Sequence, residues 1–146
     1  MKRIAAIALF VAATLLTTGS ALAQDHGVKA AVPFNFSVAG AWLPAGTYTI
    51  GSMAQRGSNV IEIGSQEKDT GAFAIGLVDR NDPSKGGELV FHRVGASYFL
   101  REVRYAHSDT KIYLPVSKAE KKARERAMEA TEASLPINDN VLIAMN

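Results

Sequence analysis

The three histidines are the side chains best suited to acid–base chemistry near neutral pH, and they are scattered along the chain. His26 lies near the N-terminus, His92 lies in a run of aromatic and β-branched residues, and His107 lies in a predicted turn. No two have metal-ligand spacing, and Glu88 and His92, four apart in a strand, would lie about 13 Å apart. We expect His92 to pack on Phe99 and to take no part in catalysis.

Nucleophilic catalysis has no recognisable basis in the sequence. The chain contains no cysteine, which excludes thiol catalysis and cysteine metal sites. It also lacks a Gly-x-Ser-x-Gly elbow, a P-loop and a dinucleotide-binding glycine motif. We therefore expect no cofactor and a non-catalytic structural or binding role, with a hydrolase of unfamiliar design as one alternative.

The richest cluster of oxygen ligands lies in the loop that holds Asp79, Asn81 and Asp82. These side chains could bind Ca²⁺, but the loop lacks the glycine and the distal glutamate of an EF-hand. The same residue types are common in turns that bind nothing. We predict no metal site and keep these three residues as the candidates should a cation bind.

Aromatic side chains could line a surface for a ligand or a glycan. The candidates are Trp42, Tyr48, Tyr98 and Tyr105, together with Tyr113. β-Proteins also place such residues in the core and in cross-strand pairs, which is the competing interpretation. A carbohydrate- or lipid-binding module is therefore a second alternative, and it requires an exposed aromatic strip or an apolar cavity.

The N-terminus has the pattern of a signal peptide, residues 1–23. Lys2 and Arg3 precede an apolar run from Ile4 to Leu16, and Ala21-Leu22-Ala23 forms a small-residue cleavage site. The run is too short for a permanent anchor, so we expect no transmembrane segment after cleavage. The pattern predicts export, with the mature protein periplasmic or secreted.

The mature chain would be a single neutral domain. Without Lys2 and Arg3, the 16 basic residues become 14, which balance the 14 acidic ones. Nucleic acid is therefore not expected as a partner, whereas a protein or a glycan partner stays open. The length suits one domain, which we place at residues 24–135, with a tail at 136–146 that either returns as an edge strand or stays disordered.

Short alternating segments with turn signals between them predict a mainly β fold. We expect six to eight strands in one antiparallel β-sandwich or small barrel. The predicted strands are 31–38, 47–52, 59–65, 71–79, a hairpin over 88–105, and 111–116. In the segment 71–79, Phe73, Ile75 and Leu77 share one face, while the other face carries only small residues and lets another element approach closely.

The hairpin over residues 88–105 is the centre of the predicted sheet. Gly95 suits the first central position of a type II′ turn, where φ is positive. That turn places Arg93 opposite Tyr98, His92 opposite Phe99, Phe91 opposite Leu100, and Val90 opposite Arg101. Neither face of the hairpin is cleanly polar, so both faces should be at least partly covered.

One helix is predicted near the C-terminus, at about residues 118–133. Ser117 and Glu120 form a capping box at its start, and Glu120 and Arg124 form an i,i+4 pair of opposite charge. The apolar side consists mainly of alanines. We expect a solvated surface helix that rests on this alanine stripe; a mobile or partner-binding helix is the alternative.

Several short motifs occur in order along the mature chain: Val32-Pro33-Phe34-Asn35-Phe36, Leu43-Pro44-Ala45-Gly46-Thr47-Tyr48, Leu89-Val90-Phe91-His92-Arg93, Tyr98-Phe99-Leu100 and Leu114-Pro115-Val116-Ser117-Lys118. In this pattern the chain resembles a group of small exported bacterial β-rich proteins of uncharacterised function. The resemblance covers most of the mature chain. It implies a shared fold and export, and it implies no activity, ligand or site.

Overall fold

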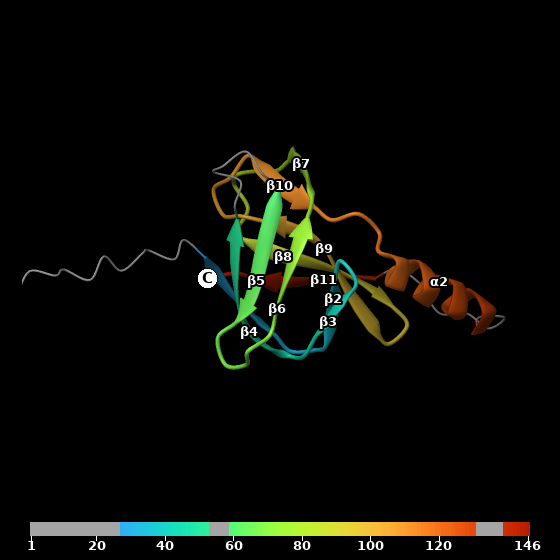
Figure 1. Ribbon diagram of the computed structural model, residues 1–146. Helices are drawn as coiled ribbons and strands as arrows, with labels where there is room; N and C mark the ends of the chain where they lie inside the picture. Colours follow the sequence, from blue (N-terminus) through green and yellow to red (C-terminus); the bar gives the residue numbers. More distant parts are fainter. Residues whose placement is uncertain (1–26, 53–58, 131–138) are drawn as a thin grey trace, which may run out of the picture.

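The computed structural model describes residues 27–52, 59–130 and 139–146, which form a β-rich body with one helix at its side (Figure 1). The predicted signal peptide and residues 131–133 of the predicted helix lie outside the described residues. The strands are β1 (Val28–Val32), β2 (Phe36–Val38), β3 (Ala41–Leu43), β4 (Gly46–Ser52), β5 (Val60–Ser65), β6 (Gly71–Ile75), β7 (Leu77–Arg80), β8 (Glu88–Val94), β9 (Ser97–Arg104), β10 (Thr110–Tyr113) and β11 (Asp139–Ala144), and the helix is α2 (Lys118–Ala130).

The strands form two sheets, which confirms the predicted sandwich-like fold with one C-terminal helix. One sheet has the order β1-β4-β5-β6; the other has the order β11-β8-β9-β10-β7, with β2 beside β9 and β3 beside β2. Figure 1 shows β4, β5 and β6 in front of β8, β9 and β11. The strands of the described residues do not close into a barrel, and all pairings are antiparallel except that of β2 with β9.

The eleven strands of the described residues exceed the predicted six to eight. The chain crosses between the sheets near Pro33 and again at Gly76, so the predicted strands 31–38 and 71–79 each become two. Strand β1 begins at Val28, three residues before the predicted strand 31–38, and the tail returns as the edge strand β11 beside β8. In the same residues, no helix is both long and apolar enough to cross a membrane.

Gly76 is the point at which the small-residue face of 71–79 meets another element. A Cβ atom on Gly76 would lie 2.3 Å from Ile112 Cγ2 and 2.9 Å from the carbonyl oxygen of Tyr113. Ala72 and Ala74 are buried on the same face. The predicted close approach is therefore confirmed, and it turns the large side chains of β6 outward.

The core lies between the two sheets and is centred on three interlocked aromatic rings. Phe36 packs edge-on against Tyr48 and against Phe91, with ring centroids 5.2 Å apart in both pairs. All three side chains are almost fully buried. Burial of such rings contributes several kcal/mol to folding, roughly 1.5–3 kcal/mol for each fully buried side chain.

Candidate functional site

Arg101 leaves the regular strand pattern because β9 contains a bulge. The turn at Gly95 has the predicted positive φ, 60°, and Phe91 pairs with Leu100 as expected. The predicted pairing of Val90 with Arg101 is wrong, because the register shifts there and Val90 pairs with Glu102. The extra residue in β9 leaves Arg101 without a partner in β8, while its side chain stays on the same face as His92 and Phe99.

The helix α2 begins on a side-chain cap and directs a carboxylate inward. The backbone N–H of Glu120 donates to Ser117 Oγ at 3.1 Å, so this half of the predicted capping box is confirmed. The Glu120 side chain does not complete the box. It turns toward the larger sheet and is only 1% exposed, so the helix is fixed by an acidic residue as well as by its alanines.

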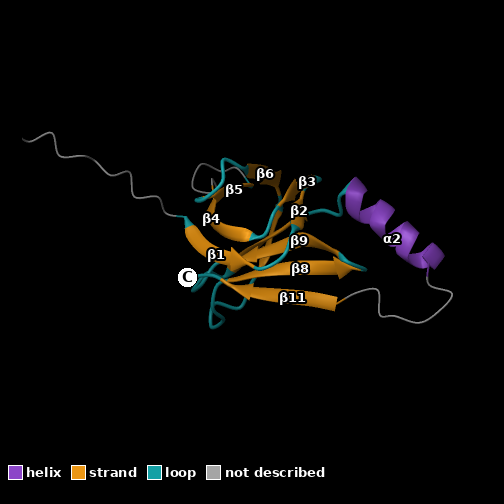
Figure 2. Ribbon diagram, turned by 90° about the horizontal axis from the view of Figure 1, so that it is seen from below, coloured by secondary structure: helices purple, strands orange, loops and turns teal. Residues whose placement is uncertain are grey.

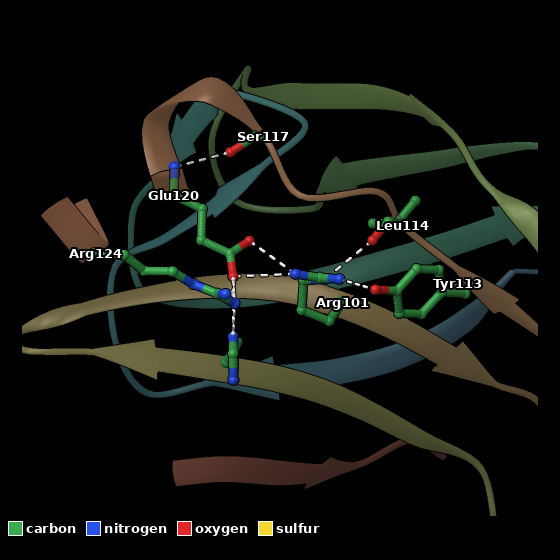
Figure 3. A network of polar contacts seen from close by, with 7 residues as sticks. Arg101, Tyr113, Leu114, Ser117, Glu120 and Arg124 are labelled. Atoms are coloured by element: carbon green, nitrogen blue, oxygen red, sulfur yellow. Dashed lines mark hydrogen bonds and ion pairs between the residues drawn. The ribbon is translucent and has the colours of Figure 1, made fainter. Parts of the chain in front are cut away.

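The Glu120 carboxylate is surrounded by three nitrogen-bearing side chains (Figure 3). Arg101 Nη1 donates to both carboxylate oxygens, at 3.0 and 3.1 Å. Arg124 Nη2 lies 2.7 Å from Oε1, which confirms the predicted i,i+4 pair. Nδ1 of His92 lies 2.9 Å from the same oxygen. A single buried anion is thus shared between the sheet and the helix.

Arg101 makes further contacts with the segment that leads into α2. Its Nε donates to the carbonyl oxygen of Leu114 at 3.0 Å, and its Nη2 donates to the hydroxyl of Tyr113. The guanidinium carbon also lies 4.8 Å from the centroid of the Tyr113 ring, a cation–π distance. These contacts hold Arg101 in one geometry and join β9 to β10 and α2.

The charge state of Glu120 follows from these neighbours. Burial alone would raise the pKa of Glu120, but the hydrogen bond with His92 and the charges of Arg101 and Arg124 outweigh it and hold the pKa below its ordinary value. Glu120 is therefore ionised at neutral pH. The cluster of Glu120, Arg101, Arg124 and His92 is called the buried ion cluster below.

A polar cleft of about 400 Å³ opens beside the buried ion cluster, and its chemistry is limited. His92, Arg101, Tyr113 and Arg124 line it. His92 pairs with Phe99 as predicted, and its Nδ1 also lies 2.8 Å from Arg124 Nη2. Among the described residues that line it, none is a serine or threonine, and the Tyr113 hydroxyl accepts from Arg101. The cleft offers a base without an adjacent nucleophile.

The four aromatic candidates do not come together. Tyr48 is 1% exposed; burial raises its pKa, and its hydroxyl donates to the carbonyl oxygen of Pro44 at 2.5 Å. Tyr98 stacks on Phe34, and Tyr105 packs against the core. Trp42 alone among the four is a large exposed side chain. Among these candidates, the core and cross-strand interpretation fits three, and Trp42 lies on the surface beside Phe99.

The three candidate cation ligands take part in separate turn contacts. Asp79 accepts from the backbone N–H of Arg80, Asn81 donates to the carbonyl oxygen of Ser108, and Asp82 accepts from Ser84. The Asp82 hydrogen bonds from Ser84 lower the pKa of that carboxyl group. Nowhere in the described parts of the chain do three acidic or histidine side chains gather as a metal site would require.

An apolar groove of about 780 Å³ runs beside β6. Phe73 and Ile75 line it and are 64% and 74% exposed. Pro115 and Val116, which precede α2, form part of the opposite wall. We call this feature the β6 groove. Exposed apolar side chains gathered along a groove are typical of binding surfaces.

The sequence alone did not identify the buried ion cluster or the β6 groove. The buried ion cluster was detectable only in part, through the Glu120–Arg124 spacing, because Arg101 and His92 lie 19 and 28 positions from Glu120. For the β6 groove, the alternation of residues 71–79 revealed the two faces and did not show which of them faces outward.

Comparisons of the chain with protein-family models, with curated proteins and with solved structures found no match.

Proposed function

We propose that this protein is exported and acts as a non-catalytic binding protein, with the β6 groove as its binding surface. The observation that carries this proposal is the exposure of Phe73 and Ile75 beside a sheet edge with which no other described strand pairs. Large apolar side chains rarely gather on a surface that contacts only water. Export to the periplasm or beyond is supported by the N-terminal pattern of Lys2, Arg3 and the apolar run that follows.

A non-catalytic role is supported by how the ionisable groups are used. The carboxylate of Glu120 is bound by Arg101, Arg124 and His92, so it serves to attach α2 to the sheet. Hydrolysis needs a nucleophile or an activated water, a base near it, and a stabiliser for the developing charge. Among the described residues that line the polar cleft, the one hydroxyl is that of Tyr113, which Arg101 binds, so none is supplied for the first of these requirements.

The binding proposal is tested with the fluorescent apolar dye anilinonaphthalene sulfonate. The mature protein should enhance its fluorescence, and Phe73→Lys should remove the enhancement. Leu142→Lys is the matched control, because Leu142 is 54% exposed on β11, away from the β6 groove. Equal dye binding by the wild type and Phe73→Lys, both folded by circular dichroism, contradicts the proposal.

The non-catalytic part is tested by a substrate screen with ester, glycoside, phosphate and peptide substrates. We expect no turnover by the purified mature protein. Turnover that vanishes in His92→Ala while the variant stays folded would show that the protein is an enzyme.

A further inference from the structure

The backbone of β6 presents free hydrogen-bonding groups to the groove. Among the described strands, β6 pairs with β5 only. The flanking bonds fix the register: Gly76 N–H donates to the carbonyl oxygen of Asn59, and Ser65 N–H donates to that of Thr70. Bonding alternates along an antiparallel pair. The main-chain groups of Ala72 and Ala74 therefore face β5, and those of Phe73 and Ile75 face away from it.

This edge lacks three of the features that usually prevent strand addition. Natural edge strands are commonly protected by charged residues, by proline or by bulges. The segment Gly71–Ile75 contains no charged residue and no proline, and its pairing with β5 is regular. Within the described residues, no strand pairs with its outer edge. Within the described residues, the edge therefore combines main-chain groups that no strand pairs with and two exposed apolar side chains.

The walls of the β6 groove favour a single extended segment over the edge of a second sheet. The β2–β3 turn at Gly40 and the chain from Pro115 to Ala119 lie across from β6 (Figure 2). If the edge strand of a second sheet paired with β6, the strand next to it in that sheet would collide with these walls. A single extended segment has no such neighbouring strand. The volume of about 780 Å³ lies within the range of ligand sites, about 300–1,000 Å³.

The charge of the groove indicates what the segment carries. Among the described residues that line the β6 groove, Lys118 alone is charged, and it is exposed. A carboxylate on the ligand would be attracted to this ammonium group. The remaining lining is apolar or small, which suits a segment whose other side chains are apolar.

We propose that the β6 groove binds an extended, mainly apolar segment of another polypeptide, which adds as a strand to β6 and places a carboxylate beside Lys118. This inference rests on the proposed function and specifies its ligand. Main-chain bonds to Phe73 and Ile75 provide affinity, and alternate side chains of the ligand contact their apolar side chains. The carboxylate is either the C-terminus of the segment or an acidic side chain.

The experiment is a selection of random heptapeptides with free carboxyl ends on the mature protein, counter-selected on Phe73→Lys. Enriched peptides should alternate apolar residues and carry a carboxylate. Methylation of the peptide's main-chain nitrogens along the edge that pairs with β6 should weaken binding by at least about tenfold. Methylation along the peptide's other edge should leave binding unchanged. Leu142→Lys should bind like the wild type.

The carboxylate is tested with matched peptides. Removal of its charge, by a C-terminal amide or by Asp→Asn in the peptide, should weaken binding about threefold, and Lys118→Gln should abolish that difference. The amide and the Asp→Asn peptide separate the two sources of the carboxylate. If removal of the peptide's charge weakens binding to Lys118→Gln as much as it weakens binding to the wild type, the carboxylate does not lie beside Lys118.

The remaining outcomes separate the two proposals. If the dye binds in a Phe73-dependent manner and no Phe73-dependent peptide is enriched, the strand-addition inference fails and the proposed function stands. If neither binds, both fail. A dimer in sedimentation experiments that Phe73→Lys dissociates would show that a second copy occupies the edge, which also overturns the inference. Insensitivity to main-chain methylation on both edges excludes strand addition.

Discussion

Replacement of Glu120 by glutamine is the most informative perturbation of the buried ion cluster. Glutamine keeps the shape of the side chain and removes its charge. Its amide nitrogen is a donor, so it cannot accept the hydrogen bonds that one carboxylate oxygen accepts from Arg101 or Arg124. The cap between the Glu120 N–H and Ser117 is unaffected, because it uses only the backbone of residue 120.

The expected cost is about 3 kcal/mol of unfolding free energy, since removing one partner of a buried ion pair typically costs about 3–5 kcal/mol. The low end applies for two reasons. The Arg124 side chain is 29% exposed and can be rehydrated, and Arg101 keeps its bonds to Leu114 and Tyr113. For a domain of this size, that cost lowers the melting temperature by about 12 °C.

The assay is urea unfolding followed by circular dichroism, with Glu125→Gln as the matched control. Glu125 is an exposed acidic residue of the same helix, and its replacement should change stability by less than about 0.5 kcal/mol. If the two variants are equally stable, Glu120 does not attach α2 to the sheet and the structural argument for the cluster is wrong.

Three further changes test the fold and its charges. Gly76→Ala should cost about 1–3 kcal/mol in urea unfolding, because its Cβ would lie 2.3 Å from Ile112 Cγ2; an unchanged midpoint contradicts the close approach. Gly95→Val should cost about 1–3 kcal/mol, because a β-branched residue must then adopt a φ near 60°; unchanged thermal stability would rule out the turn. Because the folded pKa of Glu120 is below its ordinary 4.5, its stabilisation is present above pH 4.5 and is lost as the pH falls through the folded value. The unfolding free energies of the wild type and Glu120→Gln should therefore run parallel above that pH and converge below it; a constant difference would refute the pKa direction.

Local patterns were sufficient to predict the elements that depend on neighbouring residues. The turn at Gly95 and the first pairs of the hairpin follow from one glycine and the alternation of the residues beside it. The cap at Ser117 likewise depends on a few residues. Such features are predictable because both interacting groups lie close together in the sequence.

Features that depend on distant contacts could not be predicted. The partner of Arg101, Glu120, lies nineteen positions further along the chain, and the bulge that leaves Arg101 unpaired in β9 has no local signal. The orientation of β6 depends on the close approach of Ile112 to Gly76. This approach requires the small residues of the segment to face the core. Hydrophobicity favours the opposite orientation, with Phe73 inside, so the exposed groove was not expected.

Hydrogen exchange at the amides of β6 tests the central claim most directly. In the free protein, the amides of Phe73 and Ile75 should exchange rapidly, whereas those of Ala72 and Ala74, which face β5, should be protected. A saturating peptide from the selection should slow exchange at Phe73 and Ile75 by at least about tenfold and leave Ala72 and Ala74 unchanged. Unaltered exchange at Phe73 and Ile75 in the bound protein would contradict binding along this edge.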